Sequence, residues 1–404
     1  MKPLEQRTIA VEGKHLPYSP ILAVQVPLDF LDANIGFLPL GRSHADQSLL
    51  ERMLKLAGTS CGTKSDFTLK EVAQEILREE TQLDLTRYNL YVSAKGARDA
   101  LSQVFDSLVT EKKPVVAYAV PNWIFDNVVK QVPKAQTYAF HATTSQEFVE
   151  CFEAEANGDW AAVILTDPSN PLGYRLNEAE MHRIETIADR YGIVPVFDDV
   201  FRGMQPRQKR TSASEYSSSS IIVETTSKRF GARGLGVTWT LIPKELRLNP
   251  NITIGCEGCE NAAAIITRGL HEVKYETCIG NLMTENTRAF IAGMKAIGGI
   301  PGATYHVPFE GSPLFTVHWD PNLFPADTLA SLSESMITFS PGTGFIRDSA
   351  NIICRDLRRE EEFGQSYAQI CPTKINCEEA FMGGQLLVSQ AIELTKLMER
   401  GSNR

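Results

Sequence analysis

The chain has 404 residues, of which 43% are hydrophobic and 22% charged, with 28 glycines and 21 prolines. This composition excludes collagen-like, coiled-coil and wholly disordered proteins, and the length corresponds to two or three domains of ~150 residues. The 49 acidic residues outnumber the 40 lysines and arginines, which gives a net charge of −9 at pH 7. Proteins that bind duplex nucleic acid usually show the opposite balance or a basic stripe, so we expect a small-molecule ligand and no nucleic acid.

The first twenty residues carry charges and prolines where a signal peptide needs an apolar run. No stretch approaches the roughly 20 apolar residues of a membrane-spanning helix. The eight cysteines are scattered, whereas a secreted disulfide framework is denser. Cys256 and Cys259 have the spacing of half a zinc site, but the sequence supplies no matching second half. We therefore expect a cytoplasmic protein with reduced thiols, no metal site and no membrane association.

Apolar strands alternate with amphipathic helices through the middle of the chain. The expected strands are 115–120, 161–165, 193–197 and 221–223. A capping-box pattern opens a helix after Thr144, and Asn177 with Glu180 opens a second helix that ends at Gly192. Strands joined by helices of this length form βαβ crossovers, so we predict an α/β fold with a mainly parallel sheet sandwiched by helices.

Glycine and proline cluster at 298–302, which suggests a domain boundary. Short strands and a helix from Glu378 to Met398 are expected after it. We expect a large domain at 46–299 and a smaller α+β cap domain formed by 1–45 and 300–404. Four basic residues are expected on a solvated surface: Arg202, Arg207, Lys209 and Arg210.

Unusual residues follow several of the expected strands, at the edge where parallel sheets bind their ligands. Asn170-Pro171-x-Gly173 follows the second strand, Asp198 follows the third, and Ser227-Lys228 follows the fourth. Asp198 lies 28 residues after Asn170, and Lys228 lies 30 residues after Asp198. Each of these motifs alone is weak evidence for a function, because Asn-Pro and Ser-Lys dipeptides are common.

Together, these residues resemble the fold type I pyridoxal-phosphate (PLP) enzymes of the aminotransferase class I/II family, over roughly residues 35 to 360. The resemblance implies that Lys228 forms a Schiff base with the cofactor and then takes the α-proton of the substrate. It implies that Asp198 faces the pyridine nitrogen, Asn170 donates to the phenolic oxygen and Trp123 stacks on the ring. The structural alternatives are a surface lysine, a capping aspartate, an ordinary Asn-Pro turn and a core tryptophan.

The resemblance also implies where the phosphate and the substrate bind. Backbone amides at a helix start, two hydroxyls and a guanidinium would hold the phosphate: Gly96, Ala97, Arg98, Thr225, Ser227 and Arg233. Arg355 would clamp the α-carboxylate of the substrate, with Arg347 and Arg358 as rivals. Gly41 resembles the glycine that lets the amino-terminal segment pass over the substrate.

Three features depart from the family pattern. Phe201 stands where the family usually has a tyrosine, and phenylalanine cannot donate a hydrogen bond. The phosphate arginine usually lies eight residues after the lysine, where this chain has Gly236, so Arg233 would have to replace it. The tyrosine that a partner subunit normally contributes is absent from residues 58–63.

The resemblance implies a homodimeric PLP enzyme with shared active sites, an aminotransferase acting on an α-amino acid. The alternative reaction is a PLP-dependent elimination, substitution or cyclisation in specialised amino-acid biosynthesis, since these also begin with loss of the α-proton. A more remote alternative is a non-catalytic effector-binding fold. That alternative would require a DNA-binding appendage, and the first 35 residues show neither a helix-turn-helix nor a basic arm.

Overall fold

The computed structural model describes residues 67–122, 125–204, 212–230, 236–254, 257–272, 274–299, 303–307, 315–318, 340–341, 352–353, 367–370, 385 and 388. The chain divides into two units. One comprises His44–Ile279 with Asp348–Asp356, and the other comprises Met1–Ser43, Gly280–Arg347 and Leu357–Arg404.

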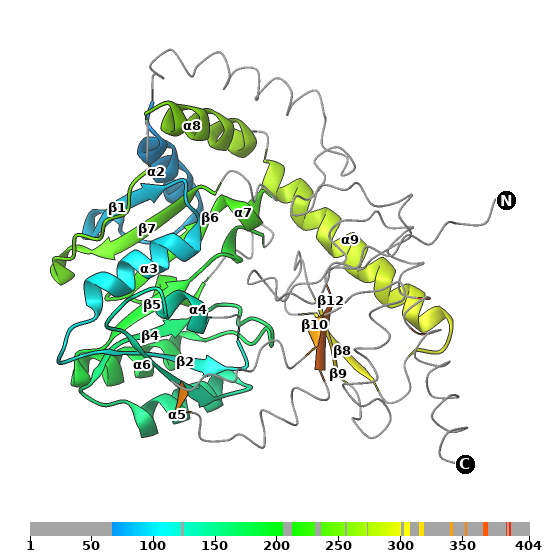
Figure 1. Ribbon diagram of the computed structural model, residues 1–404. Helices are drawn as coiled ribbons and strands as arrows, with labels where there is room; N and C mark the ends of the chain where they lie inside the picture. Colours follow the sequence, from blue (N-terminus) through cyan, green and yellow to red (C-terminus); the bar gives the residue numbers. More distant parts are fainter. Residues whose placement is uncertain are drawn as a thin grey trace. The chain divides into compact units, whose positions relative to one another are not determined.

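An eight-stranded sheet forms the centre of the first unit (Figure 1). Its strand order is β1 (Tyr88–Ser93), β7 (Thr238–Pro243), β6 (Ile221–Thr225), β5 (Val194–Asp198), β4 (Trp160–Leu165), β2 (Val115–Val120), β3 (Gln136–His141) and β11 (Ile352–Ile353). β7 is antiparallel to both of its neighbours, and the strands from β6 to β11 run parallel. The prediction of a mainly parallel α/β sheet is therefore confirmed.

Helices cover both faces of this sheet. On one face, α2 (Leu69–Glu80), α5 (Ser145–Glu155), α6 (Glu178–Tyr191) and α8 (Glu257–Glu272) share a core with Ala117 and Val163. On the other face, α3 (Ala97–Leu108) and α4 (Phe125–Val129) share a core with Val116 and Ile164. Adjacent strand residues enter opposite cores because side chains alternate across a sheet. β4 is buried along its whole length, as expected for a strand covered on both faces.

The predicted helix ends are present in the structure. Thr144 caps α5 by accepting a hydrogen bond from the backbone of Glu147, whose carboxylate reaches back to the backbone of Thr143. Asn177 and Glu180 form a complete capping box at the start of α6. Gly192 ends α6 in the left-handed conformation (φ 63°, ψ 39°), which glycine adopts without steric cost.

The other described elements are short turns of the first unit, or belong wholly or partly to the second unit. Single 3-10 turns are η2 (Leu85–Arg87), η3 (Arg202–Met204), η5 (Ala213–Tyr216) and η7 (Lys244–Leu246), and α7 spans Thr226–Arg229. Helix α9 runs from Tyr275 to Ala296. An antiparallel sheet has the order β10 (Ser340–Pro341), β12 (Tyr367–Ile370), β9 (Phe315–His318) and β8 (Thr304–His306). The helix expected over 378–398 lies outside the described residues, apart from positions 385 and 388.

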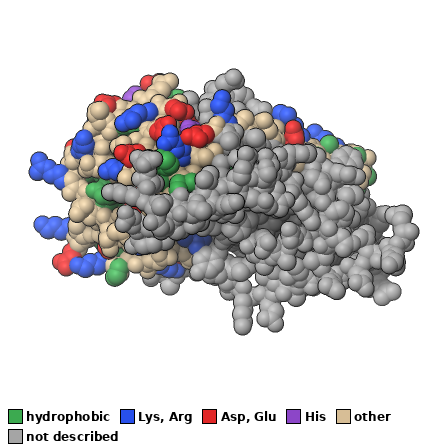
Figure 2. Space-filling model, turned by 90° about the horizontal axis from the view of Figure 1, so that it is seen from above, with side chains coloured by type: hydrophobic (Ala, Val, Ile, Leu, Met, Phe, Trp, Pro, Cys, Tyr) green, Lys and Arg blue, Asp and Glu red, His purple; other side chains and the backbone are tan. Residues whose placement is uncertain are grey.

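The described surface carries both signs of charge. Figure 2 shows lysine and arginine side chains interspersed with aspartate and glutamate side chains on the coloured part of the face in view. Within the described ranges, no helix combines the length and apolar character needed to cross a bilayer.

Candidate active site

The predicted site residues come from consecutive parallel strands. Asp198 is the last residue of β5, and β6 leads directly into α7, which carries Lys228. β5 and β6 are parallel neighbours, so their carboxyl ends meet at one edge of the sheet. Phe201 follows Asp198, and its ring centroid lies 6.0 Å from Nζ of Lys228. The structure therefore brings Asp198, Phe201 and Lys228 together.

Asp198 is a buried carboxyl group with an open oxygen. The residue is 5% exposed, and within the described part of the chain Oδ1 has no hydrogen-bond partner. Burial raises the pKa of Asp198 to about 7, and the positive charge of Lys228 opposes this shift. Buried polar atoms are nearly always hydrogen-bonded, so an open Oδ1 suits a donor from a ligand, such as a protonated ring nitrogen.

The neighbouring carboxyl group, Asp199, is satisfied by the protein itself. The hydroxyls of Ser212 and Ser214 donate to its two oxygens, each at 2.8 Å. Burial raises the pKa of Asp199, against the attraction of Arg202. Of the two adjacent aspartates, Asp198 is therefore the one with an oxygen open to a ligand.

Asn170 lies in a loop that is held in place after β4. Asn170 itself is buried. Asp167, three residues earlier, forms an ion pair with Arg175 at 3.2 Å and accepts a hydrogen bond from the backbone of Ala213 at 2.8 Å. Burial raises the pKa of Asp167, and Arg175 opposes this. The loop also closes on itself, because the backbone N–H of Ser169 donates to the carbonyl of Tyr174 at 2.9 Å.

Helix α7 is fixed by the hydroxyl of Thr225. This oxygen accepts a hydrogen bond from the backbone of Ser227 at 3.2 Å and donates to the carbonyl of Val237 at 2.9 Å. Thr225 therefore caps the helix that carries Lys228 and ties it to the residue before β7. Ser227 and Lys228 are half-buried.

The start of α3 lacks a side-chain cap. Gly96 occupies the capping position with φ 87° and ψ 163°, whereas Thr68, Thr144 and Asn177 cap α2, α5 and α6 through their side chains. The backbone N–H of Gly96 donates to the carbonyl of Gly236 at 2.7 Å, so this amide is already used. Ala97 and the half-buried Arg98 form the first turn, where backbone N–H groups suit an anion.

Arg202 is buried, and the prediction of a solvated position for it is wrong. Its side chain is only 3% exposed and pairs with Glu224 and with Glu215, the latter at 2.8 Å, while Nη2 also donates to the backbone carbonyl of Glu80. These partners come from β6, η5 and α2, and local sequence does not reveal that they meet. Arg207, Lys209 and Arg210 lie outside the described residues.

Arg229, next to Lys228, belongs to the same ion-pair network. It forms an ion pair with Glu80 of α2 and lies 3.9 Å from Glu224. Burial lowers the pKa of Arg229 to about 10, against the attraction of Glu276, so the guanidinium stays charged at neutral pH. The Nε1 atom of Trp239 donates to Glu224 at 3.2 Å. The sequence signal for this network is a charged residue, Glu224, directly after the three apolar residues that begin β6.

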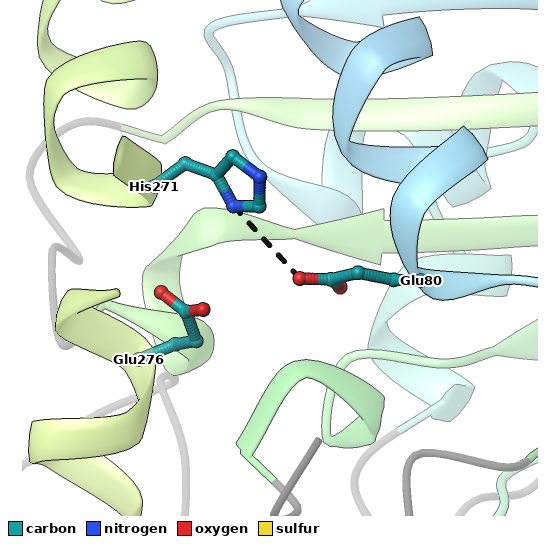
Figure 3. A group of neighbouring side chains, drawn as sticks. All are labelled: Glu80, His271 and Glu276. Carbon is teal, nitrogen blue, oxygen red and sulfur yellow. Dashed lines mark ion pairs between the residues drawn. The ribbon is translucent and has the colours of Figure 1, made fainter. Parts of the chain in front are cut away.

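Glu80, His271 and Glu276 point toward one another (Figure 3). One potential ligand atom from each lies within 4.8 Å of the others. Nδ1 of His271 is 3.8 Å from Glu80, and Nε2 is 3.1 Å from Glu79. Because the guanidinium of Arg229 already pairs with Glu80, we interpret this group as part of the ion-pair network rather than as a metal site.

Four predicted site residues lie outside the described residues: Gly41, Trp123, Arg233 and Arg355. The same holds for the rivals Arg347 and Arg358, for residues 58–63 and for the side chains of Cys256 and Cys259. The structure therefore describes the residues expected near the cofactor ring, Asp198 and Asn170, together with Lys228. It also describes the start of α3, where the phosphate is expected to bind.

Solved structures show the same fold. N-succinyldiaminopimelate aminotransferase from Mycobacterium tuberculosis aligns with a TM-score of 0.64 and 17% identity, over 87% of this chain and 94% of that one. YbdL from Escherichia coli, identified with a methionine aminotransferase function, aligns with a TM-score of 0.63 and 16% identity, over 87% and 89% of the two chains.

Sequence comparison points to the same group of proteins. The chain is 26% identical to valine–pyruvate aminotransferase from Mycobacterium tuberculosis over 205 residues, which is 48% of this chain and 51% of that protein. The match thus spans about half the length of this curated relative. The family model for aminotransferase class I and II matches residues 62–266, which contain the sheet strands β1 to β7, Asp198 and Lys228. With half of the chain matched and the fold shared, the chain belongs to the aminotransferase class I and II family.

Proposed function

We propose that this protein is a PLP-dependent enzyme that acts on an α-amino acid, with transamination as its reaction. The observation that carries the proposal is the buried Asp198 at the carboxyl edge of the sheet, whose Oδ1 has no hydrogen-bond partner among the described residues and which is attracted by the positive charge of Lys228. The family membership and the aminotransferase names of the relatives support it.

The residues of the site fit this cofactor. PLP, when bound, supplies an electron sink for bond breaking at the substrate α-carbon. Asp198 would accept a hydrogen bond from the ring nitrogen and hold a proton there. Lys228 would hold the cofactor aldehyde covalently and then move the α-proton of the substrate. Asn170 would donate to the phenolic oxygen, and Trp123 would stack on the ring.

The phosphate and substrate contacts complete the proposal. The first turn of α3, at Ala97 and Arg98, would meet the phosphate, with Ser227 and Arg233 beside it. On the substrate side, Arg355 would bind the α-carboxylate and Gly41 would lie over the substrate. Gly96 and Thr225 would contribute by positioning α3 and α7, since the Gly96 amide and the Thr225 hydroxyl are already bonded within the protein.

The larger organisation is also a proposal. We infer a PLP-binding domain at 46–299 and a cap domain formed by 1–45 and 300–404. The inferred bounds differ from the two compact units at residues 280–299, which group with the second unit, and at β11, which pairs with the large sheet. We further infer a cytoplasmic homodimer with shared active sites and without nucleic-acid or membrane partners. The negative net charge of −9 supports the exclusion of nucleic acid.

The proposed function is tested by reconstituting purified protein with PLP and reducing it with borohydride. Peptide mass analysis should find the cofactor on Lys228, and Lys228→Ala should lose turnover while still binding PLP non-covalently. A label on another lysine would overturn the assignment of the site.

A panel of amino acids then separates the reactions. Release of a 2-oxo acid with formation of pyridoxamine phosphate supports transamination. Release of ammonia with a keto product identifies elimination instead, and binding of amino acids without any product identifies a non-catalytic protein.

A further inference from the structure

Two backbone turns meet at the start of α3. The first, Ala94 to Gly96, joins β1 to α3. The second contains Gly236, which lies two residues before the start of β7. The N–H of Gly96 donates to the carbonyl of Gly236 at 2.7 Å. This hydrogen bond links the N-cap residue of α3 to the residue two positions before β7.

Gly236 has no room for a side chain. Its φ is +61°, in the left-handed region that L-residues rarely adopt. A Cβ atom on Gly236 would lie 2.7 Å from the carbonyl oxygen of Ala94 and 3.3 Å from its carbonyl carbon. Both of these atoms belong to the backbone, so they cannot rotate away as a side chain could.

Displacement of the Ala94 carbonyl would move the start of α3. Ala94 and Gly96 belong to the turn that sets the position of the Ala97 and Arg98 amides, and α3 has no side-chain cap to hold its first turn. At Gly96 itself, a Cβ atom would meet nothing within 4 Å. Gly96 is therefore constrained by its own φ of +87°, whereas the close contact with Ala94 depends on Gly236.

We infer that Gly236 is a positioning residue for the phosphate end of the cofactor site. Its missing side chain keeps the first turn of α3 in place, and any side chain there, including arginine, weakens phosphate binding. This inference rests on the proposed function. It also gives a physical reason for one departure from the family pattern. The Ala94 carbonyl occupies the space where the Cβ atom of an arginine at position 236 would lie.

The test compares Gly236→Ala and Gly236→Arg with Gly192→Ala. Gly192 has nearly the same φ, +63°, but its added Cβ would meet only Nζ of Lys113, the end of a flexible side chain. All three variants lose a glycine with positive φ, so all three cofactor-free proteins should unfold at lower temperature than the wild type. The control thus separates general backbone strain from the contact with Ala94.

The decisive measurement is equilibrium affinity for PLP and for pyridoxal, which lacks the phosphate. Both Gly236 variants should bind PLP at least about tenfold more weakly, which corresponds to about 1.4 kcal/mol. Their affinity for pyridoxal should stay at the wild-type value, and Gly192→Ala should bind both ligands as the wild type does.

Three results would overturn the inference while leaving the proposed function intact. These are unchanged PLP affinity in Gly236→Ala, tighter PLP binding by Gly236→Arg, and an equal loss of affinity for PLP and pyridoxal. A wild-type protein that binds no PLP would instead overturn the proposed function and this inference with it.

Discussion

Asp198 ends β5 and Asp199 follows it directly, but the two side chains have different surroundings. Two serine hydroxyls occupy the oxygens of Asp199, whereas Oδ1 of Asp198 has no donor among the described residues. The sequence predicted the role of Asp198 only through its spacing from Asn170 and Lys228. The environments that distinguish the two aspartates depend on Ser212, the N-cap of η5, and on Ser214 within η5, and no local sequence pattern indicates that these serines contact Asp199.

Replacement of the Asp198 carboxylate should impair catalysis strongly. In Asp198→Asn, an amide cannot balance a protonated ring nitrogen, so we expect kcat to fall at least ~10²-fold. Steady-state kinetics with saturating PLP measures this. Asp199→Asn serves as the matched control. It should lower the free energy of unfolding and have a smaller effect on kcat than Asp198→Asn has. Near-normal kcat in Asp198→Asn would mean that Asp199, or no acid, faces the ring.

The raised pKa of Asp198 also predicts a pH dependence of stability in the cofactor-free protein. The unfolded carboxyl group ionises near pH 4, whereas burial keeps the folded group protonated up to about pH 7. The folded state therefore holds one more proton between these values, and stability relative to Asp198→Asn should fall as the pH rises from about 4 to about 7. A pKa moved from 3.8 to about 7 corresponds to a loss of about 4 kcal/mol at most.

Urea unfolding of both proteins across this pH range gives the difference directly. Addition of PLP should flatten the dependence, because a positive ring nitrogen would stabilise the ionised carboxylate. A difference that does not change with pH in the absence of PLP would show that Asp198 is ionised in the folded state with an ordinary pKa.

Helix α7 spans only four residues, so its position depends on its anchors. Thr225 caps its start, and Arg229 pairs its end with Glu80 of α2. An isolated helix of this length is unstable in water, because the conformational entropy lost in forming the first turn exceeds the stabilisation from its hydrogen bond. The orientation of Lys228 is therefore set by the buried contacts of the residues on either side of it.

Arg229→Met should destabilise the protein by about 3–5 kcal/mol, because it leaves the buried carboxylates of Glu80 and Glu224 without this cation. The matched control is Arg183→Met, since Arg183 pairs with Glu153 at the surface, with side-chain exposures of 49% and 40%. That variant should lose less than about 1 kcal/mol. Urea unfolding at pH 7 compares the two, and equal losses would contradict a structural role for the Arg229 network.

The elements that the sequence predicts best are those whose signals are local. The strand expected at 115–120 matches β2, and the Asn177 capping box and Gly192 bound α6 as expected. In contrast, no local pattern indicates that β7 inserts antiparallel between β1 and β6, because this depends on register with both neighbours. The burial of Arg202 escaped prediction for the same reason, since its partners come from distant segments.

At the scale of the whole molecule, the proposed homodimer has a direct test. The chain mass is 44.8 kDa, and sedimentation equilibrium of the PLP-loaded protein should give twice this mass. The measurement should be repeated over a range of protein concentrations, because a dimer follows mass action. A monomer at all concentrations, with full activity, would contradict shared active sites.

The far edge of the large sheet is completed late in the chain. Ile352 and Ile353 of β11 pair with Thr137 and Tyr138 of β3, so two segments far apart in sequence form neighbouring strands. During synthesis, β3 is an edge strand until residues 352–353 have left the ribosome and can pair with it. The unpaired backbone groups of an edge strand can pair with other chains. Contacts of such high contact order also form slowly. Nascent or truncated chains that lack β11 are therefore expected to depend on chaperones and to aggregate more readily than the full-length protein.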